Sequence, residues 1–165
     1  MNKYSLDEWG EDPKSIEGRE LYIPPGVETE PTILIADENP LDPYFFLRAL
    51  RTVRRHCQIH VVSDREQAIS YLSGKPPFND RKRFPMPELV LLGCKTPKLD
   101  AYGVLGWIKT QPALDGLQVV VFSDSTLEKE PSRAKQLGAK DYRTRPNTPW
   151  ALARTVRELT SKWLS

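Results

Sequence analysis

The stretch PELVLLGCKTP, residues 87–97, sets the architecture that the rest of the chain is expected to follow. Its unbroken apolar run from Leu89 to Leu92 is typical of a strand buried on both faces inside a parallel sheet. In such sheets the functional groups lie just beyond the carboxyl ends of the strands. Because this run ends at Gly93, the glycine and the nearby Lys95 are expected at the functional site.

Three further strands are predicted, and polar or charged residues stand at the end of each. Strand 32–36 precedes Asp37 and Glu38, strand 118–122 precedes Ser123, and strand 142–145 ends at Arg145 before Pro146. A fifth strand is predicted over 58–62. The carboxyl ends of parallel strands meet at one edge of a sheet, so these polar residues are expected to lie close together.

Helical patterns alternate with the five strands. The first helical pattern has Pro40 and Pro43 before an apolar spacing of Phe46, Leu50 and Val53. The second has a capping-box variant at Asp64 and Gln67 and ends at Gly74, and the third starts near Asp100 and stops at Pro112. The fourth has a possible capping box at Ser125 and Glu128, with Pro131 in its first turn and an end before Gly138, and the fifth has an apolar stripe of Trp150, Ala153, Val156 and Leu159 within 148–164. This alternation predicts a doubly wound α/β fold.

Residues 31–165 resemble the CheY-like receiver domain of response regulators. In that family an acidic pair follows the first strand, Ser or Thr ends the fourth strand, an aromatic lies in the fifth, and Lys-Pro ends the fifth. The matching residues here are Asp37 and Glu38, Ser123, Tyr142, and Arg145 with Pro146. The resemblance implies a flavodoxin-like (βα)5 fold with a five-stranded parallel sheet in the order 2-1-3-4-5.

The sequence departs from the family where the phosphorylated Asp should stand, because that position is Gly93. Phosphoryl transfer to a receiver needs a carboxylate nucleophile and a divalent metal. Gly93 removes the nucleophile and one metal ligand together, and Asp100 reads as a helix N-cap rather than a replacement. We therefore expect a non-catalytic pseudo-receiver without a cofactor, with weak or absent Mg²⁺ binding at the vestigial acidic pair.

Two carboxylates side by side, Asp37 and Glu38, require compensation by positive charge. Lys95 and Arg145 flank the same pocket, and a guanidinium has a planar fork that suits carboxylates. One hypothesis is an internal salt-bridge cluster of these four residues in place of metal and phosphate. The alternative that stays open is a solvated acidic pair with Lys95 pointing to water.

The resemblance also assigns Ser123 and Tyr142 to the switch pair that reports phosphorylation. The alternative is that Ser123 only ends a strand and Tyr142 only packs. Because the family's Lys-Pro bond is cis, a cis bond before Pro146 is expected here.

The composition is that of one domain with a tail. Residues 1–30 are expected to form a largely irregular extension, and 31–165 the receiver-like domain. With 24 basic and 22 acidic side chains the net charge is +2, which gives no electrostatic footprint for nucleic acid. Cys57 and Cys94 are expected to be free thiols, and the absence of a long apolar run predicts a cytoplasmic protein without a membrane segment.

We therefore expect an atypical stand-alone response regulator that acts as a protein-interaction module in two-component or phosphorelay signalling. The partner would be a sensor kinase or another signalling protein. A homodimer is plausible through the face of the last two helices and the last strand, with Arg143, Trp150 and Trp163 as interface candidates beside Tyr142. Two alternatives remain: a phosphoacceptor that uses another residue, and a receiver-fold sensor of a nucleotide or flavin.

Overall fold

The computed structural model of the protein describes residues 30–37, 47–49, 57–94, 100–123, 129–146 and 148–164. Its elements are β1 (Thr32–Ala36), β2 (Gln58–Val62), α2 (Arg65–Ser73), β3 (Leu89–Cys94), α3 (Ala101–Lys109), the 3-10 turn η4 (Pro112–Leu114), β4 (Gln118–Ser123), α4 (Lys129–Gln136), β5 (Asp141–Thr144) and α5 (Pro149–Trp163). Residues 47–49 are also helical. The expected extension up to residue 29, the two prolines at the start of the first helix and the capping box at 125–128 lie outside the described residues.

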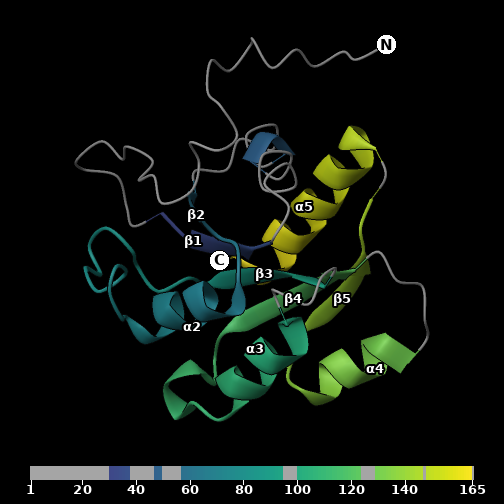
Figure 1. Ribbon diagram of the computed structural model, residues 1–165. Coiled ribbons are helices and arrows are strands. Elements are labelled where there is room, and N and C mark those ends of the chain that lie inside the picture. The colour runs from purple at the N-terminus through teal and green to yellow at the C-terminus, as the bar shows by residue number, and fades with distance from the viewer. Residues whose placement is uncertain are drawn as a thin grey trace.

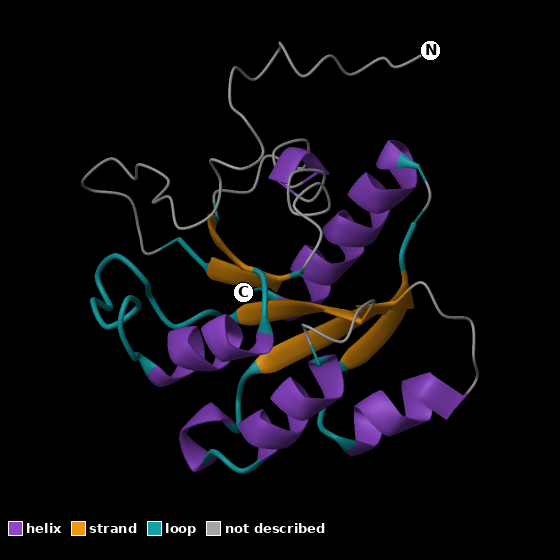
Figure 2. Cartoon of the chain, viewed as in Figure 1, coloured by secondary structure: helices purple, strands orange, loops and turns teal. Residues whose placement is uncertain are grey.

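The five strands form one parallel sheet in the order β2-β1-β3-β4-β5. This order confirms the flavodoxin-like fold that the sequence predicts. Figure 2 shows the strands, in orange, as a central layer between helices. Among the described residues no helix has the length and apolar character that crossing a bilayer requires.

Both faces of the sheet are covered, which explains why its central strands are apolar throughout. In β1, Leu34 and Ala36 pack into one core cluster, whereas Ile33 and Ile35 pack into the other. In Figure 1, α2, α3 and α4 lie on one side of the sheet and α5 lies on the other. The alternation of side chains along each strand therefore feeds two separate cores from one run of residues.

Helix boundaries follow the local signals. The Asp64 carboxylate accepts a hydrogen bond from the Gln67 backbone N–H at 2.7 Å, and α2 ends at Gly74 with φ of 71°. Asp100 caps α3 in the same way, through the Gly103 N–H at 3.0 Å. Pro131 is the third residue of α4, as predicted, because a missing N–H costs little in a first turn.

The predicted apolar stripe of α5 is wrong at Trp150, which is 68% exposed. The buried apolar side chains of this helix are Leu152, Val156 and Leu159, with Leu152 in the place that the sequence analysis gave to Trp150. Trp150 stands two residues before Leu152, about 200° away around the helix axis. It therefore faces solvent, whereas the stripe faces the sheet.

The loop between α2 and β3 carries a small aromatic core that the sequence analysis did not foresee. Phe78 and Phe84 pack against each other and against Tyr71, with ring centroids 5.2 to 6.0 Å apart. Arg81 of this loop donates to the carbonyls of Tyr71 at 2.8 Å and Leu72 at 3.1 Å. It thereby satisfies orphan carbonyls at the end of α2 and fixes the loop.

His60 of β2 is enclosed by this aromatic core. Its ring centroid lies 5.5 Å from that of Tyr71 and 5.4 Å from that of Phe84, and the residue is 2% exposed. Burial lowers the pKa of His60 from 6.5 to about 4, because the charged form loses its hydration. The folded protein therefore holds His60 neutral at pH values where the unfolded chain protonates it.

The free energy of unfolding should consequently fall as the pH drops from about 6.5 to about 4, by up to about 3 kcal/mol from this residue, and the loss should level off below that range. His60→Phe should lose less stability over the same interval in urea unfolding. Carboxylates titrate in both proteins, so the difference between the two curves isolates His60. His56→Gln, which removes the other histidine, serves as the control. Parallel curves for His60→Phe and the unsubstituted protein would contradict this assignment.

Candidate functional site at the carboxyl ends of the strands

The residues singled out at the strand ends meet at one edge of the sheet. Asp37 directly follows β1, Gly93 lies in the neighbouring β3, Ser123 ends β4, and Arg145 directly follows β5. The register places Gly93 opposite Phe122, and Ser123 opposite both Cys94 and Thr144. Glu38 and Lys95 lie outside the described residues, so their part of the predicted cluster stays a prediction.

A buried ion pair joins the two ends of this row. Arg145 Nη2 donates to Asp37 Oδ2 at 2.9 Å, and the side chains are only 12% and 4% exposed. The backbone holds both residues in place, because Asp37 N–H donates to Val62 O at 3.0 Å and Arg145 N–H donates to Ser123 O at 2.8 Å. A charge-assisted hydrogen bond of this kind is stronger than a neutral one, and burial protects it from screening by salt.

Gly93 provides the space for the pair. A Cβ atom at this position would lie 2.9 Å from Asp37 Oδ2 and 3.3 Å from Arg145 Nη2. Contacts below 3.0 Å require a neighbour to shift, so a side chain at position 93 would move the Asp37 carboxylate from its present position beside Arg145. The glycine thus leaves room for the ion pair in the geometry seen here.

At this edge position 93 has no side chain, and the Asp37 carboxylate is bound to the Arg145 guanidinium. Within the described residues, no group of three or more His, Cys, Asp or Glu side chains is placed to hold a metal. Arg145 places a positive charge beside Asp37.

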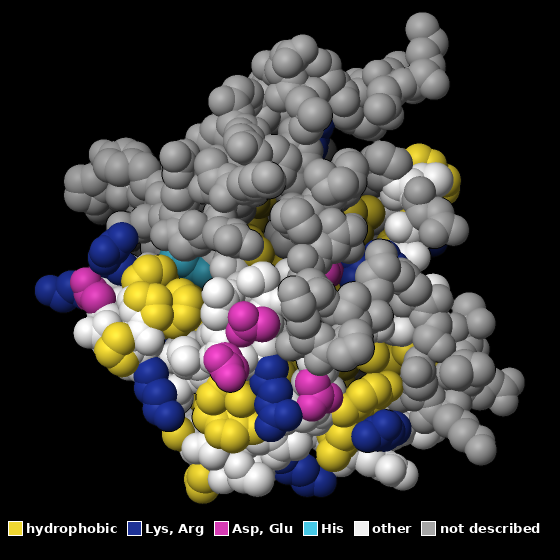
Figure 3. Space-filling model, in the orientation of Figure 1, with side chains coloured by type: hydrophobic (Ala, Val, Ile, Leu, Met, Phe, Trp, Pro, Cys, Tyr) yellow, Lys and Arg dark blue, Asp and Glu magenta, His cyan; other side chains and the backbone are white. Residues whose placement is uncertain are grey.

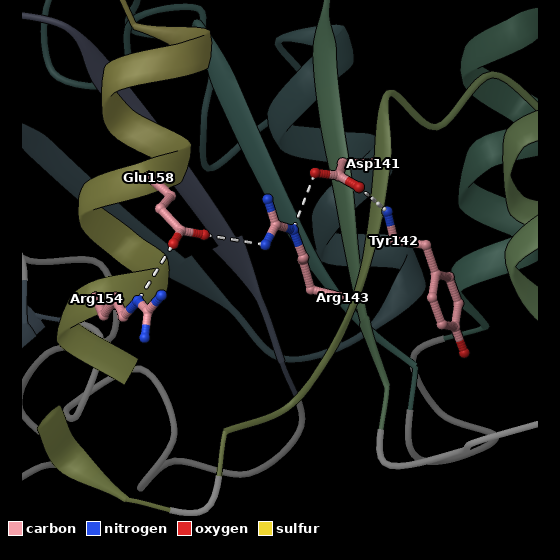
Figure 4. A network of polar contacts seen from close by, with 5 residues as sticks. All are labelled: Asp141, Tyr142, Arg143, Arg154 and Glu158. Atoms are coloured by element: carbon pink, nitrogen blue, oxygen red, sulfur yellow. Dashed lines mark hydrogen bonds and ion pairs between the residues drawn. The ribbon is translucent and has the colours of Figure 1, made fainter. Parts of the chain in front are cut away.

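Ser123 and Tyr142 are both packed into the fold. Ser123 is fully buried, and its hydroxyl donates to Cys94 O at 3.4 Å, a long hydrogen bond. Tyr142 is partly buried and packs against the core cluster beneath α2, α3 and α4. In Figure 4 its ring points away from Arg143, as expected for neighbouring residues of a strand. The switch role of Ser123 and Tyr142 stays a prediction.

Arg143 lies on the opposite face of β5, toward α5. Its guanidinium bonds to Asp141 Oδ2 at 3.0 Å and to Glu158 Oε2 at 3.1 Å, and Glu158 also pairs with Arg154 at 3.5 Å (Figure 4). The sequence analysis missed these carboxylate partners. The signals were present, since Asp141 is two residues from Arg143 and Glu158 is four residues from Arg154.

The other interface candidates do not come together. Trp150 lies in the first turn of α5 and Trp163 is its last residue, so about 20 Å of helix separates them. Pro146 also differs from the prediction. In the described part of the chain the cis peptide bond is Pro76–Pro77, and the Arg145–Pro146 bond is not cis. The trans isomer is the one that an X-Pro bond favours by about 0.5–1 kcal/mol.

Two curated relatives can be aligned with four-fifths of this chain. The chain is 29% identical over 132 residues to the probable methanogenesis regulatory protein FilR2 of Methanothrix harundinacea, covering 80% of this chain and 83% of the relative. It is 26% identical over 132 residues to the response regulator Rcp1 of Synechocystis, covering 80% and 88%. None of the protein-family models compared with the chain matches it.

Solved structures of response regulators have the same fold. The response regulator RPA3017 in red light signaling of R. palustris superposes with a TM-score of 0.78 at 27% identity, covering 82% of this chain and 94% of that one. The phosphorylated cyanobacterial phytochrome response regulator RcpA gives 0.75 at 27%, covering 83% and 96%. The Mn²⁺-bound form of Rcp1 gives 0.72 at 26%, covering 82% and 95%.

Removal of one partner of the buried pair should be costly. Arg145→Met leaves the Asp37 carboxylate buried without its guanidinium, and should lower the free energy of unfolding by about 3 kcal/mol. Arg65→Met is the matched control, because the Arg65–Asp100 pair has the same kind of contact at 3.0 Å with side chains 48% and 45% exposed. It should cost less than about 1 kcal/mol. Equal losses in urea unfolding would show that the Asp37–Arg145 pair is not the special contact described above.

Proposed function

We propose that this chain, a homologue of response-regulator receiver domains, is a pseudo-receiver that signals by protein contact and not by phosphorylation. It binds no resident cofactor, and Mg²⁺ binds weakly or not at all. The observation that carries the proposal is the Asp37–Arg145 ion pair packed against Gly93. The pair occupies the place where a receiver needs a free carboxylate and a metal.

The contrast with the solved relatives supports this proposal. RcpA was solved in a phosphorylated form and Rcp1 with Mn²⁺ bound. In this chain a side chain at position 93 would require the Asp37 carboxylate to shift, and that carboxylate is held by a cation that is part of the protein. We infer that the protein keeps the binding surface of a receiver, whereas its phosphorylation site accepts neither a phosphoryl group nor a metal.

The partner in this proposal is a protein, either a sensor kinase or another signalling protein, or a second copy of the chain. Nucleic acid is a poorer candidate. On the face drawn in Figure 3, described basic and acidic side chains are interspersed and do not form one basic patch. The exposed Trp150 at the start of α5 is a candidate anchor for this contact, since exposed aromatics often form the centre of an interface.

Phosphorylation chemistry tests the proposed function. Incubation with acetyl phosphate and Mg²⁺ should leave the intact mass of the unsubstituted protein unchanged, because no carboxylate stands at position 93. The double variant Gly93→Asp/Arg145→Lys restores the family residues, and should gain a phosphoryl group. Gly93→Asp alone should gain less, because the Arg145 guanidinium remains at the position where the family carries Lys. A stoichiometric phosphoryl adduct on the unsubstituted protein would mean that another residue serves as the acceptor, and the pseudo-receiver proposal would fail.

Self-association tests the surface. If the α4, β5 and α5 face forms a homodimer, Trp150→Ser should weaken dimerisation by about tenfold or more in sedimentation equilibrium, since central aromatic anchors contribute above about 1.4 kcal/mol. Met86→Ser removes another exposed apolar side chain, 42% exposed, and should leave association unchanged. A monomer at all concentrations, or equal effects of both variants, would remove the homodimer from the proposal.

A further inference from the structure

The solvent-facing side of α5 carries one aromatic and two basic side chains in a row. This row, called the outer stripe below, consists of Trp150, Arg154, Arg157 and Ser161, and all four residues are exposed. At about 100° per residue they fall within about 60° of one another around the helix axis. The buried apolar side chains of the same helix lie about 180–240° from Trp150. The outer stripe is therefore the face of α5 directly opposite the sheet.

The outer stripe contains two positive charges and no carboxylate. The acidic side chain of α5, Glu158, lies about 80° from Trp150 at the flank of the stripe. It is bonded to Arg143 of β5 at 3.1 Å and reaches Arg154 at 3.5 Å (Figure 4). Within the described part of the chain, Arg157 takes part in no ion pair. The carboxylate of α5 is thus bound at the flank by Arg143, and the outer stripe keeps its positive character.

A stripe of this composition is typical of the centre of a protein interface. Trp and Arg are among the residues that most often dominate binding free energies in protein complexes. Trp150 is 68% exposed, and the side chain of Arg154 is 73% exposed, so both are accessible to a partner. At 1.5 Å per residue the stripe is about 16 Å long. That length accommodates one short segment of another protein.

A second copy of the chain is a poor match for the outer stripe. In a twofold interface, residue i of one copy contacts residue j of the other, and j contacts i. The stripe is symmetric about the point between residues 155 and 156, so two α5 helices packed antiparallel along it would place Arg154 opposite Arg157 twice. Four guanidinium groups would then meet at the centre, and like charges facing each other suppress association.

A nucleic acid is a poor match for a different reason. Proteins that bind a duplex neutralise several phosphates, on the order of 6–10 in a well-studied case. The outer stripe offers two guanidinium groups, and the net charge of the whole chain is +2. Charge complementarity and the exposed indole ring therefore favour a protein segment that combines a few carboxylates with apolar groups.

We propose that the outer stripe binds an acidic segment of a partner protein. Carboxylates of that segment pair with Arg154 and Arg157, since a guanidinium offers two parallel N–H donors to a carboxylate. Apolar groups of the same segment pack on the exposed Trp150 ring. The inference rests on the proposed function, because it specifies the chemistry of the protein that the pseudo-receiver contacts, and it separates that protein from a second copy of the chain.

The peptide EEYEEYEE is a suitable probe, because it combines carboxylates with apolar rings. Its controls are EESEESEE, which lacks the rings, and KKYKKYKK, which has the opposite charge. The readout is the indole N–H resonance of Trp150 in ¹H–¹⁵N NMR spectra of the full chain, assigned by its loss in Trp150→Ser among the signals of four tryptophans. EEYEEYEE should shift this resonance in a saturable way, EESEESEE should bind more weakly, and KKYKKYKK should not bind. Added salt should weaken binding, because exposed charges are screened.

Arg157→Glu reverses one charge of the outer stripe without breaking a described ion pair, and should weaken the affinity for EEYEEYEE by about tenfold or more. Lys82→Glu is the matched control. It makes the same change in net charge at an exposed position of the loop between α2 and β3, and should leave the affinity unchanged. Both variants are checked for folding by the dispersion of their backbone signals. If Arg157→Glu does not fold, Arg157→Gln replaces it and should weaken binding several-fold.

Four results would overturn the proposal: no binding of EEYEEYEE, equal losses of affinity in Arg157→Glu and Lys82→Glu, tighter binding of a short DNA duplex than of the peptide, or self-association of the chain that the peptide competes away. The acetyl phosphate experiment is independent of these measurements. Absent peptide binding without a phosphoryl adduct would contradict only the acidic partner. A phosphoryl adduct with intact peptide binding would contradict only the pseudo-receiver.

Discussion

The Asp37–Arg145 ion pair is the contact on which the site at the carboxyl ends of the strands depends. It links the residue after β1 to the residue after β5, across three strand spacings or about 14 Å of sheet, at a donor–acceptor distance of 2.9 Å. Buried charges persist only when they are paired. The pair therefore needs both partners. Gly93 lies beside it, where an added Cβ would lie 2.9 Å from Asp37 Oδ2.

Much of this arrangement could be predicted from the sequence, and the reason is physical. Strands buried on both faces leave continuous apolar runs, so the positions of Asp37 and Gly93 at one sheet edge followed from where those runs end, whereas Arg145 was placed there by the resemblance to receivers. The exchange of Asp for Gly with a cation at each flank led to the hypothesis of a four-residue cluster, of which Asp37 and Arg145 are described and paired. The same pattern placed Glu38 and Lys95 in the cluster, but both lie outside the described residues.

Other features could not be predicted from periodicity, because the spacing of apolar residues along a helix does not show which of them pack on the sheet. Trp150 has the spacing of a core residue, yet the helix presents Leu152 to the sheet. The sequence does not show that the Arg81 guanidinium binds carbonyls at the end of α2, because only the folded loop brings these groups within reach. Gln118 and Trp163 were not linked at all. They are 45 residues apart in the sequence and line the same cavity only through the three-dimensional packing of β4 and α5.

The two ends of the sheet thus differ: the carboxyl ends of the strands carry an internal ion pair, and the amino ends carry a cavity. A crystal structure grown with Mg²⁺ and beryllofluoride would show directly whether the carboxyl ends are closed, because this mixture imitates a phosphorylated receiver. The ion-pair interpretation predicts an intact contact of about 2.9 Å between Arg145 and Asp37, with no metal or beryllofluoride nearby. Mg²⁺ coordinated by Asp37, with Arg145 displaced into solvent, would contradict it.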